Sequence, residues 1–328
     1  MVRRGFYLAM LFVACVSGLA LSAVVVSVEI ALDWTPNTNH TGIYVAKELG
    51  YFTEEGLDVT IVQPGPTTSI QLTGTGKTEF GVSMQEYVTM ARAQGIPVVS
   101  IAAIVQHNTS GFAFLAEKGF KTPADFAHKR YGGWGSALEE VMVRTAMEQE
   151  GADFSTVEFV NIGMVDFVTA AQRDLADFFW IFYGWAGINA EQQALDFRFV
   201  PLIELSDVFD YYTPIIITGE TLSQENPDLV RRFLRALSRG YCYAIENPEQ
   251  AAAILLEHVP ELDPALVGAS QTWLSTKYTE DADAWGIQSE AVWERFAAWA
   301  LESGLIESPI DASRAFTNEF LPQEPEGS

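Results

Sequence analysis

The chain has 328 residues, of which 43 are acidic and 19 are basic, so its formal net charge at pH 7 is −24. A phosphate backbone is bound by clustered Lys and Arg side chains, so this charge argues against a nucleic-acid partner. The hydrophobic content of 48% is too high for a disordered chain, and two cysteines cannot form a disulfide scaffold. The length predicts about two domains.

The first residues have the pattern of a secretory signal. A short basic start, Met1–Arg4, precedes an uncharged stretch, Gly5–Val28. We expect residues 1–23 to be a signal peptide, cleaved near Ala23, or a lipoprotein signal with an imperfect lipobox and a lipid anchor on Cys15. An uncleaved anchor is the third alternative. Each alternative places the protein at the periplasmic or extracellular face of the cytoplasmic membrane.

The body of the chain alternates predicted strands and helices, recognised from apolar patterns of period 2 and 3.6. Strands are expected at 24–32, 57–62, 79–82, 98–105 and 112–116, and helices at 40–49, 67–74 and 85–94. After the N-cap and proline at 122–123, strands are expected from 131 and at 157–161, 176–182 and 212–218, and helices at 138–150 and 165–173. From residue 226 the chain is almost wholly helical, with helix starts near Pro227, Pro248, Pro264 and Gln288.

This alternation predicts a parallel α/β sheet in the first unit and a second α/β unit joined to it by extended crossings. We expect residues 24–117 and 214–322 to form one lobe, 118–213 a second lobe, and 323–328 a flexible tail. A ligand cleft would lie between the two lobes, at the carboxyl ends of the strands. Cys242 falls within a predicted helix, where we expect a buried, inert thiol.

Catalytic motifs are nearly absent. The sequence has no GxSxG, Walker or HExxH motif and no well-formed GxGxxG. Gly132–Gly135 follows a strand and precedes a helix, so it is interpreted either as an anion site or, as we favour, as a backbone turn or a contact with an uncharged ligand. The four histidines lie far apart in sequence, so we expect no metal site. We therefore predict that the chain is not an enzyme and has no cofactor.

Aromatic residues are more informative, because they gather near predicted strand ends. The run Phe178–Trp185 contains five aromatics and a further Trp, and alternation directs Phe178, Trp180 and Phe182 to one face of the sheet. Further aromatics near strand ends are Trp34, Tyr87, Trp134, Tyr211 and Tyr212. As a set they favour a planar heteroaromatic ligand over a sugar phosphate or a metal.

Several segments carry a resemblance to a known family. They are Leu32–Ala46, which includes Asp33-Trp34-Thr35-Pro36-Asn37, and then Gly50–Phe52, Glu55–Val59, Gly74–Lys77 with Phe80–Val82, and Gly95–Val98. The chain resembles the thiamine-pyrimidine-binding receptor family, which includes the fungal pyrimidine synthases and is related to sulfonate and taurine receptors. The resemblance implies a type II periplasmic-binding-protein fold and capture of a vitamin precursor for an ABC importer. It also implies ligand contacts from Asp33, Trp34, Asn37, Asn39 and His40.

The chain departs from this family at informative positions. The cofactor-holding Lys and the donor His of the fungal synthases correspond here to Ser83 and Tyr87, so synthase activity is not expected. Pyrimidine receptors tend to have a carboxylate near the position of Phe182, and Glu86, Asp210 or Asp33 would have to replace it. The same replacements suit a larger tricyclic flavin.

We therefore predict a monomeric receptor that delivers a small heteroaromatic ligand to an ABC permease. The expected ligand is a thiamine pyrimidine precursor of the formylaminopyrimidine or hydroxymethylpyrimidine type. Riboflavin is the alternative, and a synthase-like enzyme or a sulfonate receptor is less favoured. The expected ligand-binding residues are Asp33, Trp34, Asn37, Asn39, His40, Gln85, Glu86, Tyr87, Trp134, Trp180, Phe182, Tyr183, Trp185, Asp210 and Tyr212.

Overall fold

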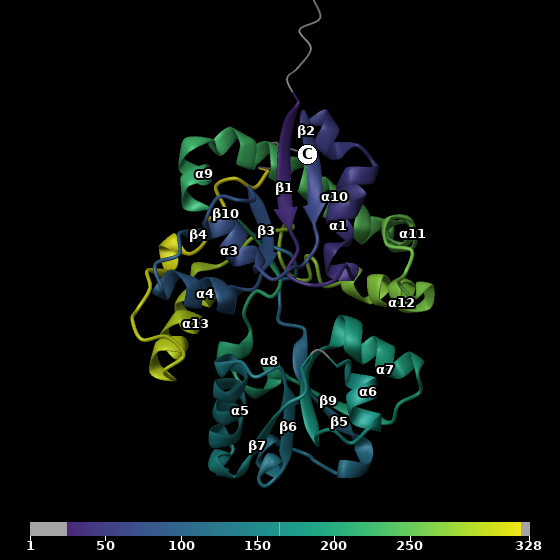
Figure 1. Cartoon of the computed structure of the whole chain (residues 1–328), viewed down its shortest axis with the longest axis vertical. Helices are drawn as coiled ribbons and strands as arrows, with labels where there is room; N and C mark the ends of the chain where they lie inside the picture. Colours follow the sequence, from purple (N-terminus) through teal and green to yellow (C-terminus); the bar gives the residue numbers. More distant parts are fainter. Residues whose placement is uncertain (1–24, 164, 323–328) are drawn as a thin grey trace, which may run out of the picture.

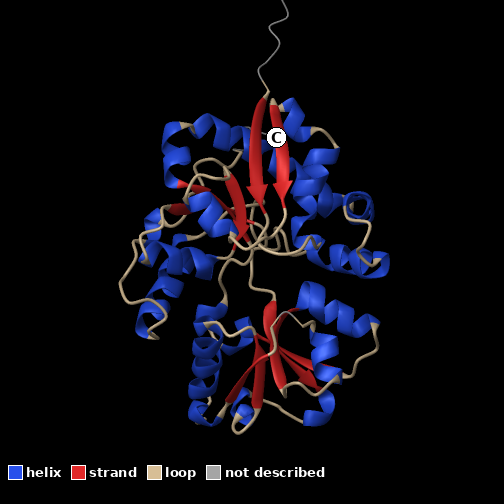
Figure 2. Cartoon of the chain, in the orientation of Figure 1, coloured by secondary structure: helices blue, strands red, loops and turns tan. Residues whose placement is uncertain are grey.

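A computed structural model of the chain describes residues 25–163 and 165–322. These residues form two lobes, one above the other in Figure 1, and each lobe is a β-sheet flanked by helices (Figure 2). The predictions for residues 1–23 and 323–328 concern segments outside the described residues. Within the described part, no helix is both long and apolar enough to cross a membrane.

The sheet of the first lobe has the order β2-β1-β3-β10-β4. Its strands are β1 (Val26–Ala31), β2 (Leu57–Val62), β3 (Phe80–Ser83), β4 (Val98–Ala103) and β10 (Ile215–Gly219). β10 is antiparallel to both β3 and β4. The prediction of a parallel sheet is therefore wrong for β10, because the chain returns from the second lobe and inserts this strand between β3 and β4. All six residues of β4 are buried, as expected for a strand covered on both faces.

The sheet of the second lobe has the order β7-β6-β8-β5-β9. Its strands are β5 (Ser110–Leu115), β6 (Arg130–Gly133), β7 (Glu158–Asn161), β8 (Phe178–Phe182) and β9 (Phe197–Pro201). β5 pairs antiparallel with β8 and with β9, a strand that the sequence patterns missed. The second lobe therefore includes residues 110–115, and the predicted boundary at 117/118 is wrong, because β5 finds both its partners in this lobe.

Helices cover both sheets. Those whose residues come before or after the second lobe are α1 (Thr41–Glu48), α2 (Tyr51–Glu54), α3 (Ser69–Gly74), α4 (Gln85–Ala93), α9 (Glu220–Glu225), α10 (Pro227–Glu246), α11 (Pro248–His258), α12 (Pro264–Ser275) and α13 (Glu290–Glu302). Those within the second lobe are α5 (Ala137–Gln149), α6 (Phe167–Gln172), α7 (Ile188–Gln192) and α8 (Leu202–Leu205). The predicted helix starts at Pro227, Pro248 and Pro264 are confirmed, because each proline occupies a first-turn position that needs no N–H partner.

The long helix α10 shows why the prediction for Cys242 is wrong. The buried positions of α10 include Phe233, Leu237, Tyr241 and Ala244, three or four residues apart, so they form one apolar stripe. Cys242 directly follows Tyr241 and lies outside this stripe, where it is exposed. The thiol is therefore a surface group.

Two chain segments cross between the lobes side by side. Ile104 donates a backbone hydrogen bond to the carbonyl of Pro214 at 3.0 Å, and the side chain of Asn108 donates to the carbonyl of Phe209 at 2.8 Å. α13 bridges the lobes, since Trp293 packs in a core of the first lobe while Phe296 packs in the core of the second. The crossings and α13 thus determine how the lobes face each other.

The lobes also touch on the opposite side, where α12 approaches the π-helical turn Tyr183–Gly187 at the end of β8. The ring of Tyr183 lies 5.3 Å from that of Trp273, and Gln192 donates to the carbonyl of Ala265 at 2.8 Å. The two lobes are consequently held at both sides of their boundary.

Candidate functional site

The loop after β1 folds around its own polar side chains. Asn37 accepts a hydrogen bond from the backbone N–H of Asn39 at 2.9 Å, and the Asn37 N–H donates to Nδ1 of His40 at 3.2 Å. Because Nδ1 accepts, the His40 proton lies on Nε2, which donates to Oδ1 of Asp33 at 2.8 Å. Asn37 and His40 are buried, whereas Trp34 is 42% exposed. The loop therefore fixes the Asp33 carboxylate and presents the Trp34 indole to solvent.

Glu86, the second residue of α4, is a buried carboxyl group without a partner. Its side chain is fully buried, and neither carboxyl oxygen has a hydrogen-bond partner among the described residues. Burial, with a smaller contribution from the negative charge of Asp33, raises its pKa to about 8. A buried polar group without a partner is rare in folded proteins, and it indicates a position that a bound molecule or water satisfies.

Tyr87, next along α4, connects the two lobes. Burial raises the pKa of its hydroxyl to about 12, together with the nearby carboxylates of Glu86, Glu139 and Asp33. A hydrogen bond with the side chain of Trp134, in the second lobe, acts in the opposite direction on this pKa. The acidic groups of the first lobe and Trp134 of the second therefore meet around the Tyr87 hydroxyl.

A column of aromatic rings extends from this point into the second lobe. The rings of Trp134 and Trp180 are stacked, with centroids 5.2 Å apart and planes 27° apart, and Phe182 lies 5.9 Å from Trp180. Trp180 and Phe178 belong to one core cluster and Phe182 packs against it, while Phe179 belongs to another, so the predicted alternation along β8 is confirmed. Trp180 is buried and its indole N–H has no partner among the described residues, whereas Trp134 is 36% exposed.

We call this group of six residues the interlobe cluster. Its members are Asp33, Glu86, Tyr87, Trp134, Trp180 and Phe182. It combines flat apolar ring surfaces with one unpaired acid. This arrangement suits binding of a planar polar ring more than chemistry on it.

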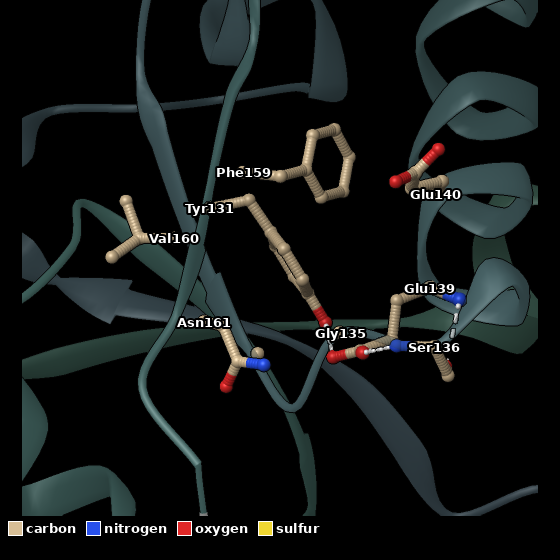
Figure 3. Close-up of a pocket in the computed structure, with 9 residues that line it drawn as sticks. Tyr131, Gly135, Ser136, Glu139, Glu140, Phe159, Val160 and Asn161 are labelled. Atoms are coloured by element: carbon tan, nitrogen blue, oxygen red, sulfur yellow. Dashed lines mark hydrogen bonds between the residues drawn. The ribbon is translucent and has the colours of Figure 1, made fainter.

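The glycine-rich loop after β6 is occupied by a carboxylate of the chain itself (Figure 3). Oε1 of Glu139 accepts from the Tyr131 hydroxyl at 2.8 Å and from the Trp134 N–H at 3.1 Å, and Oε2 accepts from the Ser136 N–H at 2.8 Å. A side chain on Gly133 would place its Cβ 1.9 Å from Oε1, so glycine is required there by this close approach. The amides that would bind an anion are therefore already paired, which favours the interpretation of this loop as a backbone turn.

A hollow of about 190 Å³ opens beside this loop. It is lined by Tyr131, Gly133, Gly135, Ser136, Glu139, Glu140, Phe159, Val160 and Asn161 (Figure 3). Two of the lining side chains, Glu139 and Glu140, are acidic and none is basic, so the hollow does not suit an anion.

Several predicted site residues have structural partners in the crossings instead. Gln85 and Tyr212 are joined by a hydrogen bond from the Tyr212 N–H to Oε1 of Gln85 at 2.9 Å, and Tyr212 Oη accepts from the Ser289 N–H at 2.8 Å. Asp210 pairs with Nδ1 of His107 at 2.8 Å. Gln85 directly precedes Glu86 in the sequence, but it and the other two residues fasten the crossings.

The end of the aromatic run also faces away from the cluster. Tyr183 packs between Phe199 and Trp273, and its hydroxyl donates to Glu191. Trp185 packs against the small apolar cluster of α1, α11 and α12 that includes Tyr44.

Asn39 contributes its carbonyl to a hydrogen bond from Tyr241 at 2.8 Å. The structure thus brings together six of the predicted residues and leaves Trp34 exposed beside them.

Glu139 was missed from the sequence, although a signal for it was present. Ser136 and Glu139 form a capping box at the start of α5, in which Ser136 accepts from the Glu139 N–H while Glu139 accepts from the Ser136 N–H. The S-x-x-E spacing directly after the glycines predicts this reciprocal pair. It would have indicated that the loop amides are occupied.

The topology of two five-stranded mixed sheets joined by two crossings is that of the periplasmic-binding-protein fold. The aliphatic sulphonate binding protein SsuA from Escherichia coli superimposes with a TM-score of 0.71 at 15% identity, covering 92% of this chain and 94% of that one. A Candida albicans protein described as having the generic periplasmic binding protein fold superimposes with a TM-score of 0.63 at 14% identity, covering 92% and 99%.

The chain belongs to the NMT1/THI5-like family, whose model matches residues 37–251. A formylaminopyrimidine-binding protein of Halalkalibacterium halodurans is 32% identical over 89% of this chain and 90% of its own length. A 4-amino-5-hydroxymethyl-2-methylpyrimidine phosphate synthase of Legionella pneumophila is 27% identical, over 94% and 96%. The riboflavin-binding protein RibY of Chloroflexus aurantiacus is 26% identical, over 90% and 86%. The resemblance inferred from the sequence motifs is confirmed.

Proposed function

We propose that this chain is the extracytoplasmic substrate-binding protein of an ABC importer and captures an amino-substituted pyrimidine precursor of thiamine. The observation that carries the proposal is the meeting of the two lobes at Tyr87. Two stacked indoles of the second lobe, Trp134 and Trp180, lie on one side of it, and its neighbour on α4, Glu86, is an unpaired buried acid of the first lobe. A pyrimidine has a flat face for the exposed indole of Trp134, which Trp180 supports from behind, and polar edge atoms for the acid.

The family relatives support this ligand class. The Halalkalibacterium halodurans relative is named for formylaminopyrimidine binding, and the enzymes among the relatives are named for a pyrimidine phosphate. The residues at the synthase positions favour binding over synthesis here. Ser83 is a buried residue at the end of β3, and the Tyr87 hydroxyl is held protonated by its raised pKa. Neither side chain replaces the Lys and His that the synthase resemblance requires.

Capture would proceed by closure of the lobes. The first lobe supplies Asp33 and Glu86 and the second lobe supplies the indoles, so a ligand between them contacts both lobes only when they are together. Ligand binding therefore stabilises the closed arrangement, which a permease can distinguish from the open one. The signal pattern of residues 1–23 supports an extracytoplasmic location.

Riboflavin is the second candidate ligand, favoured by one observation. Phe182 extends the Trp134–Trp180 column by a third ring, at a position where pyrimidine receptors tend to have a carboxylate. A longer aromatic surface suits a tricyclic ring better than a single pyrimidine ring. The riboflavin-binding relative from Chloroflexus aurantiacus supports this alternative.

Calorimetry on the purified protein with formylaminopyrimidine, hydroxymethylpyrimidine and riboflavin tests the proposal. We expect micromolar or tighter binding of at least one of the two pyrimidines, with quenching of Trp fluorescence, and no binding of an alkanesulfonate. Binding of riboflavin alone would assign the second candidate. Failure of all three compounds to bind would refute the proposed function.

A further inference from the structure

We infer that Glu86 contacts the ligand as an uncharged carboxylic acid, and that it selects planar rings with a hydrogen-bond donor next to an acceptor on one edge. This inference rests on the proposed function and specifies the ligand group that its site recognises. No comparison with a relative assigns a role to this residue.

The two carboxyl oxygens of Glu86 are buried without any partner among the described residues. The other buried acid among the described residues is not left in that state. Glu139, also almost fully buried, accepts three hydrogen bonds from Tyr131, Trp134 and Ser136. An unpartnered buried carboxyl destabilises the fold unless a bound group satisfies it. This difference between the two acids identifies Glu86 as the carboxyl group that a bound ligand would have to satisfy.

The surroundings of Glu86 disfavour its ionised form. Asp33 approaches from the loop after β1, Tyr87 lies beside it on α4, and Tyr211 approaches from the second crossing. His40 pairs with Asp33 at 2.8 Å, so its ring is directed at Asp33 and not at Glu86. No Lys, Arg or His of the described chain forms an ion pair with Glu86. Burial beside another carboxylate keeps the proton on Glu86 near neutral pH.

A protonated carboxyl group has one donor and one acceptor side by side. Its O–H donates to a ring nitrogen while its carbonyl oxygen accepts from an adjacent amino group, so an aminopyrimidine edge forms two parallel hydrogen bonds with it. The imide edge of a flavin, with an N–H next to a carbonyl, fits in the opposite sense. A sulfonate or phosphate at neutral pH offers mainly acceptors and cannot form this pair. The acid thus selects ligands by the pattern of donors and acceptors on the ring edge, and the aromatic column selects them by the shape of the ring.

Two substitutions distinguish ligand binding by the protonated form of Glu86 from ligand binding by its carboxylate anion. Glu86→Gln replaces the acid by an amide, which also has a donor next to an acceptor, while Glu86→Met keeps the volume and removes both. Glu249→Gln is the matched control, because Glu249 is also the second residue of its helix but is exposed. Dissociation constants are measured with 4-amino-5-hydroxymethyl-2-methylpyrimidine and riboflavin from pH 6 to 9, together with thermal unfolding of each variant.

We expect Glu86→Gln to bind within about threefold of the wild type at pH 7 and Glu86→Met to bind about tenfold or more weakly, the loss typical of a removed hydrogen-bonded pair. Wild-type affinity should weaken above about pH 8, whereas that of Glu86→Gln should stay level except for titration of the ligand itself. Thermal unfolding of the folded variants at pH 7 should occur no lower than that of the wild type, since each removes an unpartnered buried acid.

Three outcomes would overturn the inference. Wild-type affinity in Glu86→Met would show that Glu86 does not contact the ligand. Equal losses in Glu86→Gln and Glu86→Met, with both variants folded, would show that the anion is the binding form. Absence of binding of either compound to the wild type would refute the proposed function and the inference with it, whereas the first two outcomes leave the function standing.

Discussion

Nδ1 of His107 lies 2.8 Å from Oδ2 of Asp210, and this pair joins the two segments that cross between the lobes. Nε2 of the same ring lies 3.0 Å from Oδ1 of Asp281, an exposed residue of the first lobe. The hydrogen bond with Asp210, more than any other contact, raises the pKa of His107 to about 9. A protonated imidazole therefore fastens the crossings at neutral pH.

This pair predicts a pH-dependent contribution to stability. Because the pKa of His107 is raised by folding, its contribution is fully present below the unfolded value of about 6.5 and is lost as the pH rises through about 9. We expect His107→Gln to lower the free energy of unfolding by about 1 kcal/mol at pH 6 and by less at pH 9.5, a modest value because the pair is partly solvated. Urea unfolding of both proteins at the two pH values measures the difference, and a difference that is constant with pH would contradict the assignment.

The stacked indoles predict different effects for Trp134 and Trp180. Trp134 is 36% exposed, so Trp134→Ala should weaken ligand binding about tenfold, as expected for loss of a stacking surface, with little change in thermal unfolding. Trp180 is 6% exposed and part of the core of the second lobe, so Trp180→Ala should lower stability by about 3 to 5 kcal/mol.

Trp34→Ala provides the comparison for these two variants, because Trp34 is 42% exposed and adjoins Asp33. It should retain wild-type stability and show reduced ligand affinity. Unchanged affinity in both Trp34→Ala and Trp134→Ala would show that these aromatic surfaces are not part of the binding site. Calorimetric titration and thermal unfolding of the three variants give the two readouts separately.

The close approach at the glycine-rich loop predicts a strong effect of one methyl group. In Gly133→Ala the new Cβ would lie 1.9 Å from Oε1 of Glu139, so the carboxylate must leave its partners or the strand must shift. We expect a loss of about 1 to 3 kcal/mol in the free energy of unfolding, the usual range for overpacking. Gly268→Ala is the control, since Gly268 lies within α12 with open space around its Cβ position, and it should be neutral or slightly stabilising.

Asp33 and Glu86 are coupled, which predicts a shift in the pH dependence of binding. The charge of Asp33 raises the pKa of Glu86, so Asp33→Asn should lower that pKa. The pH at which ligand affinity begins to fall should then move down relative to the wild type, whatever the change in affinity itself. Dissociation constants measured across pH 6 to 9 test this, and an unchanged midpoint would mean that the two carboxyl groups titrate independently.

Elements with a local sequence signal could be predicted, whereas long-range pairings could not. The residues of β2, Leu57–Val62, and the starts of α10, α11 and α12 follow from β-branched runs and from prolines at first-turn positions. The insertion of β10 between β3 and β4 has no such signal, because the direction of a strand depends on where the chain returns from the second lobe. β9 was missed for a similar reason, since it is a half-buried edge strand with weak alternation.

The site was predictable as a set of residue types but not as a set of contacts. Glu86, Tyr87, Trp134 and Trp180 were expected because they follow strands or lie in them, and the structure brings them together. Asp210 was expected as well, because it lies just before the predicted strand 212–218, yet it pairs with His107. A carboxylate at a strand end can serve a ligand or a crossing, and only its neighbours in space decide between these roles.

The division of the interlobe cluster between two lobes has a consequence for unloading. Glu86 is carried by α4 of the first lobe, while Trp134 and Trp180 belong to the second. In the proposed site, separation of the lobes would leave a ring either its stacking surface or its two edge hydrogen bonds, never both. Each half-site alone binds weakly, because the two contributions no longer add on one immobilised ligand. If the proposed function holds, a permease would need only to spread the lobes in order to empty the receptor, with no chemical change in either the ring or the acid.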